Sequence, residues 1–169
     1  MALPSIITDQ DALLSINSNE QPWIRDFPVP GSHICPLFLD PQNGIWVLRV
    51  KVGPGITLPN HFHTGTVHLY TVSGRWGYVQ YPDQPQTEGC YLYEPGGSIH
   101  QFTTPIDGPA ETDTLMVIQG ANVNFDADGN FTHVVDAGFI EAMLNKVARE
   151  RGMSPLKYIR SLGAAYSVA

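Results

Sequence analysis

The sequence predicts an all-β domain, a sandwich or barrel of short strands, and three observations lead to this fold class. Short segments with apolar residues at alternate positions recur through the middle of the chain. Turn residues separate these segments, because the 16 glycines and 14 prolines of the 169 residues are scattered rather than clustered. No helical pattern lies between the segments, so a parallel α/β sheet is not indicated. The length of the chain fits a single domain.

The clearest predicted strand covers residues 45–52. Its even-numbered positions are all apolar and its odd-numbered positions include Arg49 and Lys51, so one face is expected to be buried and the other exposed. Further strands follow the same pattern, at 67–72, 76–81, 90–93, 99–103 and 114–119. The breaks between them contain the turn sequences Gly53-Pro-Gly, Ser73-Gly, Tyr81-Pro-Asp, Pro95-Gly-Gly and Asp107-Gly-Pro.

Three regions are expected along the chain: an irregular arm over 1–22, the barrel over 23–135 and a helical extension over 136–169. In the extension, apolar residues at helical spacing from Phe139 to Val147 predict one helix. Ser154-Pro155 then predicts the N-cap and first turn of a second, short helix. We expect these helices to pack on the exterior of the barrel or at a dimer interface, without a chemical role.

The composition excludes several classes of function. A net charge of −7 argues against binding to nucleic acid or to an anionic membrane surface, both of which need clustered basic residues. Cys35 and Cys90 lie far apart and form no C-x-x-C pair, so we expect two separate thiols rather than a disulfide. The sequence contains no basic and apolar leader and no apolar run of about 20 residues, so a protein of the reducing cytoplasm is expected.

The segment Asp126-Ala-Asp-Gly-Asn resembles the opening of a calcium-binding loop. Such a loop needs an acidic residue at its twelfth position, and that position is Ala137. We therefore predict a hairpin turn at this place.

Three of the six histidines, His61, His63 and His100, form a pattern that indicates a metal site. His61 and His63 are two residues apart, so on a strand both imidazoles point to the same side and can bind one ion. His100 follows a strand and the turn Pro95-Gly-Gly. We expect these three histidines to hold one divalent transition metal, and we assign no metal to His33 and His133.

These segments resemble the two cupin motifs, G-x5-H-x-H-x(3,4)-E-x6-G and G-x5-P-x-G-x2-H-x3-N. The matching residues are Gly55, His61, His63 and Gly74 for the first motif, and Gly89, Pro95, Gly97 and His100 for the second. The resemblance implies a single-domain cupin barrel, also called a double-stranded β-helix or jelly roll.

Two positions depart from the cupin pattern. Thr104 replaces the final asparagine, and the usual glutamate is missing. Counting back from Gly74 puts Val67 in the glutamate position, whereas a longer spacer after His63 puts His68 there as a fourth ligand. The fixed distance to Gly74 favours Val67 facing inward. Three neutral imidazoles alone leave the metal charge uncompensated, which favours an anionic ligand that binds through two oxygens.

Longer segments are similar to the group of dihydroxyacetophenone dioxygenases and acetylacetone dioxygenases, among them Pro22-Trp-Ile, the stretch 61–67, Gly74-Arg-Trp-Gly-Tyr78, the stretch 93–100 and the stretch 123–129. This resemblance implies a mononuclear non-haem Fe(II) enzyme, a homodimer or higher oligomer, that cleaves a carbon–carbon bond with O2. The implied substrate is a small diketone or hydroxyketone that chelates the metal as an anion. Zn, Ni or Mn can also occupy such a site.

The pocket residues are harder to assign. Trp76, Tyr78 and Gln80 are expected on one strand face, Phe102 on the same face as His100, and Met116 on the far wall. Tyr78 and Gln80 are the predicted catalytic residues, and Gln80 could hold a metal-bound water or a substrate oxygen; ordinary barrel packing is the alternative for the aromatic side chains.

Two other functions remain open. A non-oxidative cupin isomerase acting on a sugar phosphate would need inward Arg or Lys, and Arg49 and Lys51 are expected to face outward. A metal-binding sensor would bind a ligand without turnover.

Overall fold

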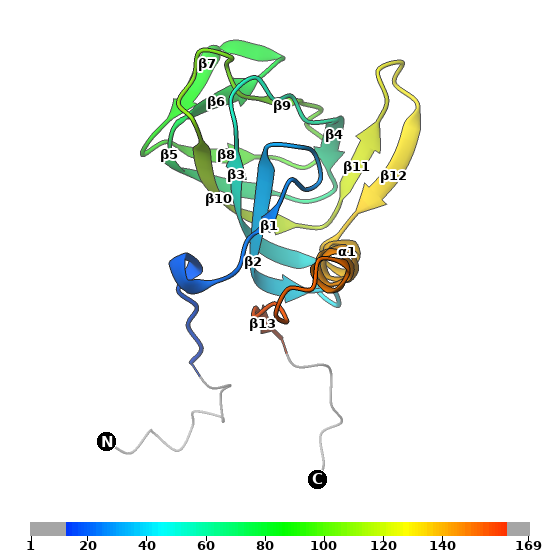
Figure 1. The fold of residues 1–169 in the computed structure, drawn as a ribbon. Coiled ribbons are helices and arrows are strands. Elements are labelled where there is room, and N and C mark those ends of the chain that lie inside the picture. Colours follow the sequence, from blue (N-terminus) through cyan, green and yellow to red (C-terminus); the bar gives the residue numbers. More distant parts are fainter. Residues whose placement is uncertain (1–12, 162–169) are drawn as a thin grey trace, which may run out of the picture.

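The computed structural model describes residues 13–161, so most of the predicted arm and the last residues of the extension lie outside it. The chain forms strands over most of this range and one α-helix (Figure 1). In chain order the elements are η1 (Ser18–Glu20), β1 (Ile24–Arg25), β2 (Ser32–Asp40), β3 (Ile45–Val52), β4 (Asn60–His63), β5 (Val67–Ser73), β6 (Arg75–Tyr78), β7 (Tyr81–Thr87), β8 (Tyr91–Glu94), β9 (Phe102–Thr103), β10 (Thr112–Gln119), β11 (Asn122–Phe125), β12 (Phe131–Val135), α1 (Ala137–Glu150) and β13 (Ile159–Arg160).

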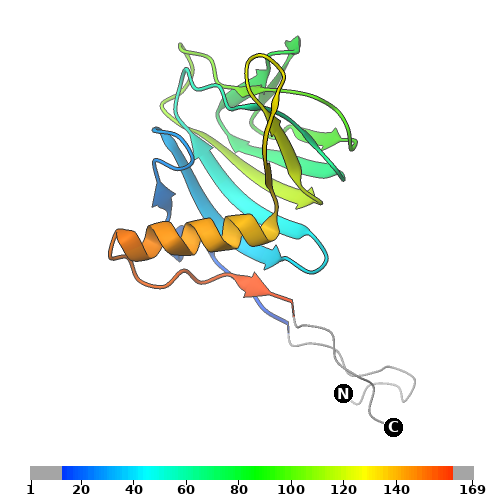
Figure 2. The same cartoon turned by 90° about the vertical axis from the view of Figure 1, so that its right-hand side faces the viewer.

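The strands form one large sheet and two smaller ones. The large sheet has the order β1-β2-β3-β10-β5-β8, with β13 added in parallel to β2. The smaller sheets have the orders β12-β11-β4 and β7-β6-β9, and all pairs except β13 with β2 are antiparallel. Helix α1 packs against β1, β2 and β12 at one end of the barrel (Figure 2). The predicted all-β barrel is therefore confirmed. No helix within residues 13–161 is long and apolar enough to cross a membrane.

The alternation predicted for residues 45–52 is observed in β3. Trp46, Leu48, Val50 and Val52 are all at most 6% exposed and form part of the core. Burial of an aliphatic side chain of this size contributes about 1.5–3 kcal/mol to folding. On the opposite face, Arg49 is bonded to Asp113 on the neighbouring strand β10. The inner face of the sheet is thus apolar, and its cations lie outside.

The turn predicted at Tyr81-Pro-Asp is wrong. Strand β6 ends at Tyr78, residues 79 and 80 form the turn, and β7 begins at Tyr81 and contains Pro82 and Pro85. Prolines are tolerated because β7 is the edge strand of its sheet, where one row of N–H groups needs no partner strand. Gln80 therefore lies beyond the end of β6 rather than on a strand face with Tyr78.

The second C-terminal helix, predicted from Ser154-Pro155, does not form among the described residues. The chain runs without regular structure to β13, which pairs with the edge of β2. Two bonds to the helix hold this path: the Tyr158 hydroxyl donates to Glu141 at 2.7 Å, and Arg160 Nε lies 3.0 Å from the same carboxylate. Ser154-Pro155 is a local signal for a helix start, but the pairing of β13 with β2 is a tertiary contact that the local sequence does not reveal.

The hairpin predicted at Asp126 is observed between β11 and β12. Asp126 Oδ1 accepts hydrogen bonds from the N–H groups of Asp128 and Asn130, at 3.0 and 2.8 Å. Gly129 has a φ of 84°, a conformation that favours glycine. This carboxylate stabilises a turn.

We expect Asp136→Ala to destabilise α1. Asp136 is the N-cap, and its Oδ1 accepts from Phe139 N–H at 2.7 Å. Loss of such a cap costs about 1 kcal/mol, which lowers the melting temperature by about 2–4 °C in a domain of this size. Thermal denaturation followed by circular dichroism measures this, with Asp136→Asn as the control that keeps a capping oxygen. Equal melting temperatures for the alanine variant and the parent would contradict it.

The two cysteines, both free thiols, are expected to differ strongly in reactivity. Cys35 is fully buried, and burial raises the pKa of its thiol to about 11 although the charge of Arg49 opposes the shift. Hydrogen bonds from the backbone N–H and hydroxyl of Thr87 lower the pKa of Cys90. At pH 8 iodoacetamide should alkylate Cys90 at least about 100 times faster than Cys35. Peptide mass spectrometry checks this, and similar rates in the folded protein would show the assignment to be wrong.

Candidate metal centre

Two segments of the chain bring His61, His63 and His100 together. His61 and His63 lie on β4, two residues apart and both pointing inward, as the i, i+2 spacing predicts. His100 is fixed against β4 by a backbone bridge, because His61 N–H donates to the His100 carbonyl at 3.1 Å and His100 N–H donates to the His61 carbonyl at 2.9 Å. One ring nitrogen of each histidine lies within 4.8 Å of the others.

Burial favours the neutral, metal-binding form of His61 and His100. All three histidines are at most 9% exposed. Burial lowers the pKa of His61 to about 4, and burial also lowers the pKa of His100. His61 Nδ1 lies 2.9 Å from the Pro59 carbonyl, so the proton is held on Nδ1 and the Nε2 lone pair is free. Protons therefore do not compete with a metal for His61 at neutral pH.

A carboxylate that the sequence motifs did not reveal completes the cluster. Glu94 is 5% exposed, and its Oε2 lies 3.2 Å from Nε2 of both His63 and His100. It ends strand β8, where it pairs directly with Val67 of β5. Val67 occupies the glutamate position of the first cupin motif, so the acidic group stands on the neighbouring strand at the same level of the barrel. The expected uncompensated three-histidine centre therefore has a carboxylate beside it.

The charge and orientation of Glu94 are fixed by its neighbours. Burial alone would raise its pKa, but the adjacent imidazoles of His63 and His100 and the hydrogen bond from Tyr78 outweigh burial, so the pKa of Glu94 is lowered. The Tyr78 hydroxyl donates to Oε1, which leaves Oε2 directed toward the histidines. Burial raises the pKa of Tyr78, and the neighbouring Glu94 raises it further, so Tyr78 remains a donor.

The donor set fits one divalent transition metal. Glu94 Oε2, which faces the histidines, is a buried polar atom without a hydrogen-bond partner among the described residues. The separation of 3.2 Å between Oε2 and each Nε2 is close to the distance of about 3 Å that adjacent ligands have when bonds of about 2.1 Å meet at right angles. Imidazole and carboxylate donors suit Fe(II), Mn(II), Ni(II) and Zn(II).

The other sequence-predicted residues lie outside this cluster. His68 faces the outer side of the large sheet, and its Nδ1 lies 2.6 Å from the Tyr91 hydroxyl. Val67 is buried and faces inward, so Val67 and not His68 occupies the glutamate position of the first cupin motif. Gln80 is exposed, and its amide oxygen accepts from Gln101 N–H at 2.8 Å. Thr104, in the asparagine position, donates to the Gly53 carbonyl at 2.7 Å and thereby holds a loop.

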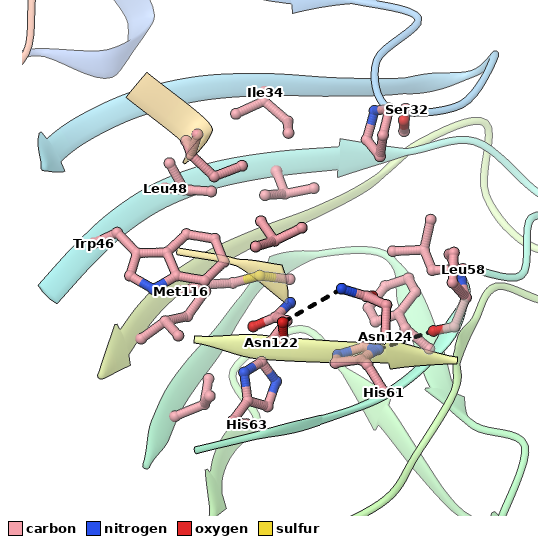
Figure 3. Close-up of a pocket in the computed structure, with 18 of the residues that line it drawn as sticks. Ser32, Ile34, Trp46, Leu48, Leu58, His61, His63, Met116, Asn122 and Asn124 are labelled. Carbon is pink, nitrogen blue, oxygen red and sulfur yellow. Dashed lines mark hydrogen bonds between the residues drawn. The ribbon is translucent and has the colours of Figure 1, made fainter. Parts of the chain in front are cut away.

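The cluster lies in the wall of a cavity of about 430 Å³ between the sheets (Figure 3). Tyr78, Phe102 and Met116 line this cavity, as expected, but Gln80 and Trp76 do not, and Trp76 is buried in the core instead. None of the described residues that line it is a lysine or an arginine. Its walls are mostly apolar, with side chains including Ile34, Trp46, Leu48, Val50, Leu58, Val67, Leu69 and Ile118.

The C-terminal helix also contributes to the cavity. Phe139, Ile140 and Met143 of α1 line it, together with the loop Phe27-Pro-Val. The sequence predicts that this helix packs on the barrel exterior, and the structure adds that three of its side chains line the cavity. Its apolar stripe indicated burial but could not show that the surface it covers is a cavity.

Known structures of one more similar protein and one distant protein share the fold of this chain. A protein of unknown function with a cupin-like fold from Ralstonia eutropha JMP134 is 47% identical over 96% of this chain and 100% of its own, with a TM-score of 0.87. An acetylacetone dioxygenase from Acinetobacter johnsonii is 16% identical over 84% of this chain and 96% of its own, with a TM-score of 0.66, which shows a common fold alone. No curated protein sequence matches. The family model described as the ChrR cupin-like domain matches residues 11–123, and the chain therefore belongs to this cupin family.

Proposed function

We propose that this protein is a mononuclear non-haem Fe(II) dioxygenase that cleaves a carbon–carbon bond of a small diketone or hydroxyketone with O2. The observation that carries the proposal is the cluster of His61, His63 and His100 in the wall of an apolar cavity, with Glu94 Oε2 3.2 Å from Nε2 of both His63 and His100. The fold shared with an acetylacetone dioxygenase supports it. Both atoms of O2 enter the products, a carboxylic acid and a second carbonyl compound.

Each residue has a definite task in this proposal. His61, His63 and His100 hold the metal, and Glu94 offsets part of its charge. When bound, Fe(II) supplies Lewis acidity toward the ketone oxygens and electrons for the activation of O2. Glu94 is the only acidic residue among the described residues that line the cavity, so we assign its carboxylate the proton from the carbon next to the carbonyl. Tyr78 keeps the other carboxylate oxygen in place, and the apolar walls exclude water.

The cavity supports a neutral substrate better than a sugar phosphate. Arg49 is bonded to Asp113, and Lys51 Nζ lies 2.6 Å from Glu111, both on the outer side of the sheet. Recognition of phosphate needs cationic or N–H donors directed at its oxygens. A sugar-phosphate isomerase is therefore disfavoured.

Oxygen uptake tests the proposal. The apo-protein is loaded with Fe(II) under argon, O2 is admitted, and oxygen consumption is followed with acetylacetone and with hydroxyacetophenones. We expect consumption of one O2 for each ketone cleaved. The Zn(II)-loaded protein is the control, because Zn(II) has no accessible redox chemistry. If no ketone stimulates uptake while the protein retains Zn(II) tightly, the dioxygenase proposal fails and a sensor without turnover is favoured.

A further inference from the structure

We propose, resting on the proposed function, that α1 closes a second subsite in the same cavity, which binds an uncharged apolar group of the substrate distant from the metal. The α1 side chains Ile140 and Met143 then determine how long a substrate the site accepts. The substrate class is a ketone whose chelating head carries an extended alkyl chain or ring.

The wall that leads from the metal cluster to α1 is the sheet β4-β11-β12. Two cross-strand rows run along its inner face: His63, Asn122 and Val135 form one, and His61, Asn124 and His133 form the other. All six of these side chains line the cavity. Neighbouring strands lie about 4.8 Å apart, so β12 is about 10 Å from the histidines on β4. The cavity thus continues well beyond the metal ligands.

Helix α1 begins directly after β12 and forms the end of this path. Phe139, Ile140 and Met143 reach the cavity, and the Phe139 ring centroid lies 6.2 Å from that of His133. The family match ends at residue 123, so α1 lies outside the matched range. The end of the cavity is therefore built by a segment separate from the two motifs that supply the histidines.

The distal part is mostly apolar, and the exposed imidazole of His133 is its polar residue. Ile34 and Leu48 lie across the cavity from His61 and His63 (Figure 3). Asn124 Nδ2 is directed to the main-chain carbonyls of Asn122 and His133, at 3.4 Å each, so its donor is already engaged. The side-chain oxygen Oδ1 of Asn122 has no hydrogen-bond partner in the described part of the chain, but Asn122 is paired with His63 and therefore lies near the metal cluster rather than near α1.

The size of the cavity also exceeds what a small chelating head requires. Its volume of about 430 Å³ lies within the range of about 300–1,000 Å³ that pockets for drug-sized ligands have. Each additional methylene that enters such a space strengthens binding several-fold.

The experiment compares ligand length in the protein and in a variant with a filled distal end. The Ni(II)-loaded protein is titrated by calorimetry under argon with acetylacetone and with nonane-2,4-dione. We expect the longer diketone to bind at least about tenfold more tightly. In Met143→Trp this advantage should disappear while acetylacetone binds as before. Lys146→Trp is the matched control, because Lys146 lies on α1 with a side chain 58% exposed.

A metal-independent measurement separates this subsite from the proposed function. The metal-free protein is titrated with 2-nonanone, a single ketone that cannot chelate, and thermal denaturation confirms that both variants are folded. Saturable binding that Met143→Trp abolishes supports the subsite even if no diketone is cleaved. The subsite proposal is overturned if 2-nonanone does not bind, or if the length of the diketone has no effect on affinity. It is also overturned if diketone length affects affinity equally in Met143→Trp and Lys146→Trp. Binding of acetylacetone alone, with turnover, would leave only the proposed function standing.

Discussion

His100→Ala is expected to lose most of its metal. The His100 imidazole is 2% exposed and contributes one of the clustered ring nitrogens, and its Nε2 also faces Glu94. Removal of residues that only support metal ligands already costs about 10–100-fold in affinity, so removal of a ligand should raise the dissociation constant by more than about 100-fold. Metal content after dialysis, measured by mass spectrometry of the elements, gives the result directly.

The chain offers a matched control for this variant. His68→Ala removes the same side chain from the outer side of the large sheet, where it contacts Tyr91 and Tyr93 rather than the cluster. We expect His68→Ala to keep the metal content of the parent protein. Equal loss of metal in both variants would indicate a general folding defect, and full retention in His100→Ala would show that the metal is held elsewhere.

Glu94→Gln is expected to weaken metal binding by about 10–100-fold and to abolish oxygen uptake. Glutamine has nearly the same shape and its side-chain oxygen can still accept from Tyr78, so the variant removes the charge and changes little else. Because the pKa of Glu94 is lowered, its carboxylate is charged at neutral pH and loses that charge only as the pH falls below the ordinary range of a glutamate. Calorimetric titration with Zn(II) at pH 7 and the oxygen electrode measure the two effects.

Two further variants show how Glu94 acts. Tyr78→Phe removes the hydroxyl that orients Glu94 and keeps the ring beside His100, so a smaller loss of metal affinity is expected. Glu88→Gln neutralises an exposed carboxylate shortly before β8 and should change neither property. If Glu94→Gln binds metal and consumes O2 like the parent protein, Glu94 is neither a metal ligand nor the base.

The fold and the histidines could be predicted because both are encoded over short distances in the sequence. Alternation along β3 decides which face is buried, and the spacing of His61 and His63 decides that they share a side. The turn before His100 places the third histidine at a fixed level. Each of these inferences needs a few neighbouring residues and one known backbone geometry.

Glu94 could not be found in this way, because its position depends on pairing between β5 and β8. A motif assigns the carboxylate to a position on one strand, whereas the structure provides it from the residue paired with Val67. The same reason explains β13, whose pairing with β2 overrides the local helix signal at Ser154. Register between strands is tertiary information, and a single sequence contains it only indirectly.

The three histidines and Glu94, the candidate metal donors, occur as two pairs, and this has a consequence for stability. His61 and His63 come from β4, while Glu94 and His100 flank the loop after β8. An ion bound to both pairs would act as a reversible cross-link between two segments that are remote in the sequence, and closing such a loop removes freedom mainly from the unfolded chain. Metal binding and folding would then be thermodynamically linked, so the melting temperature should rise with the concentration of free metal.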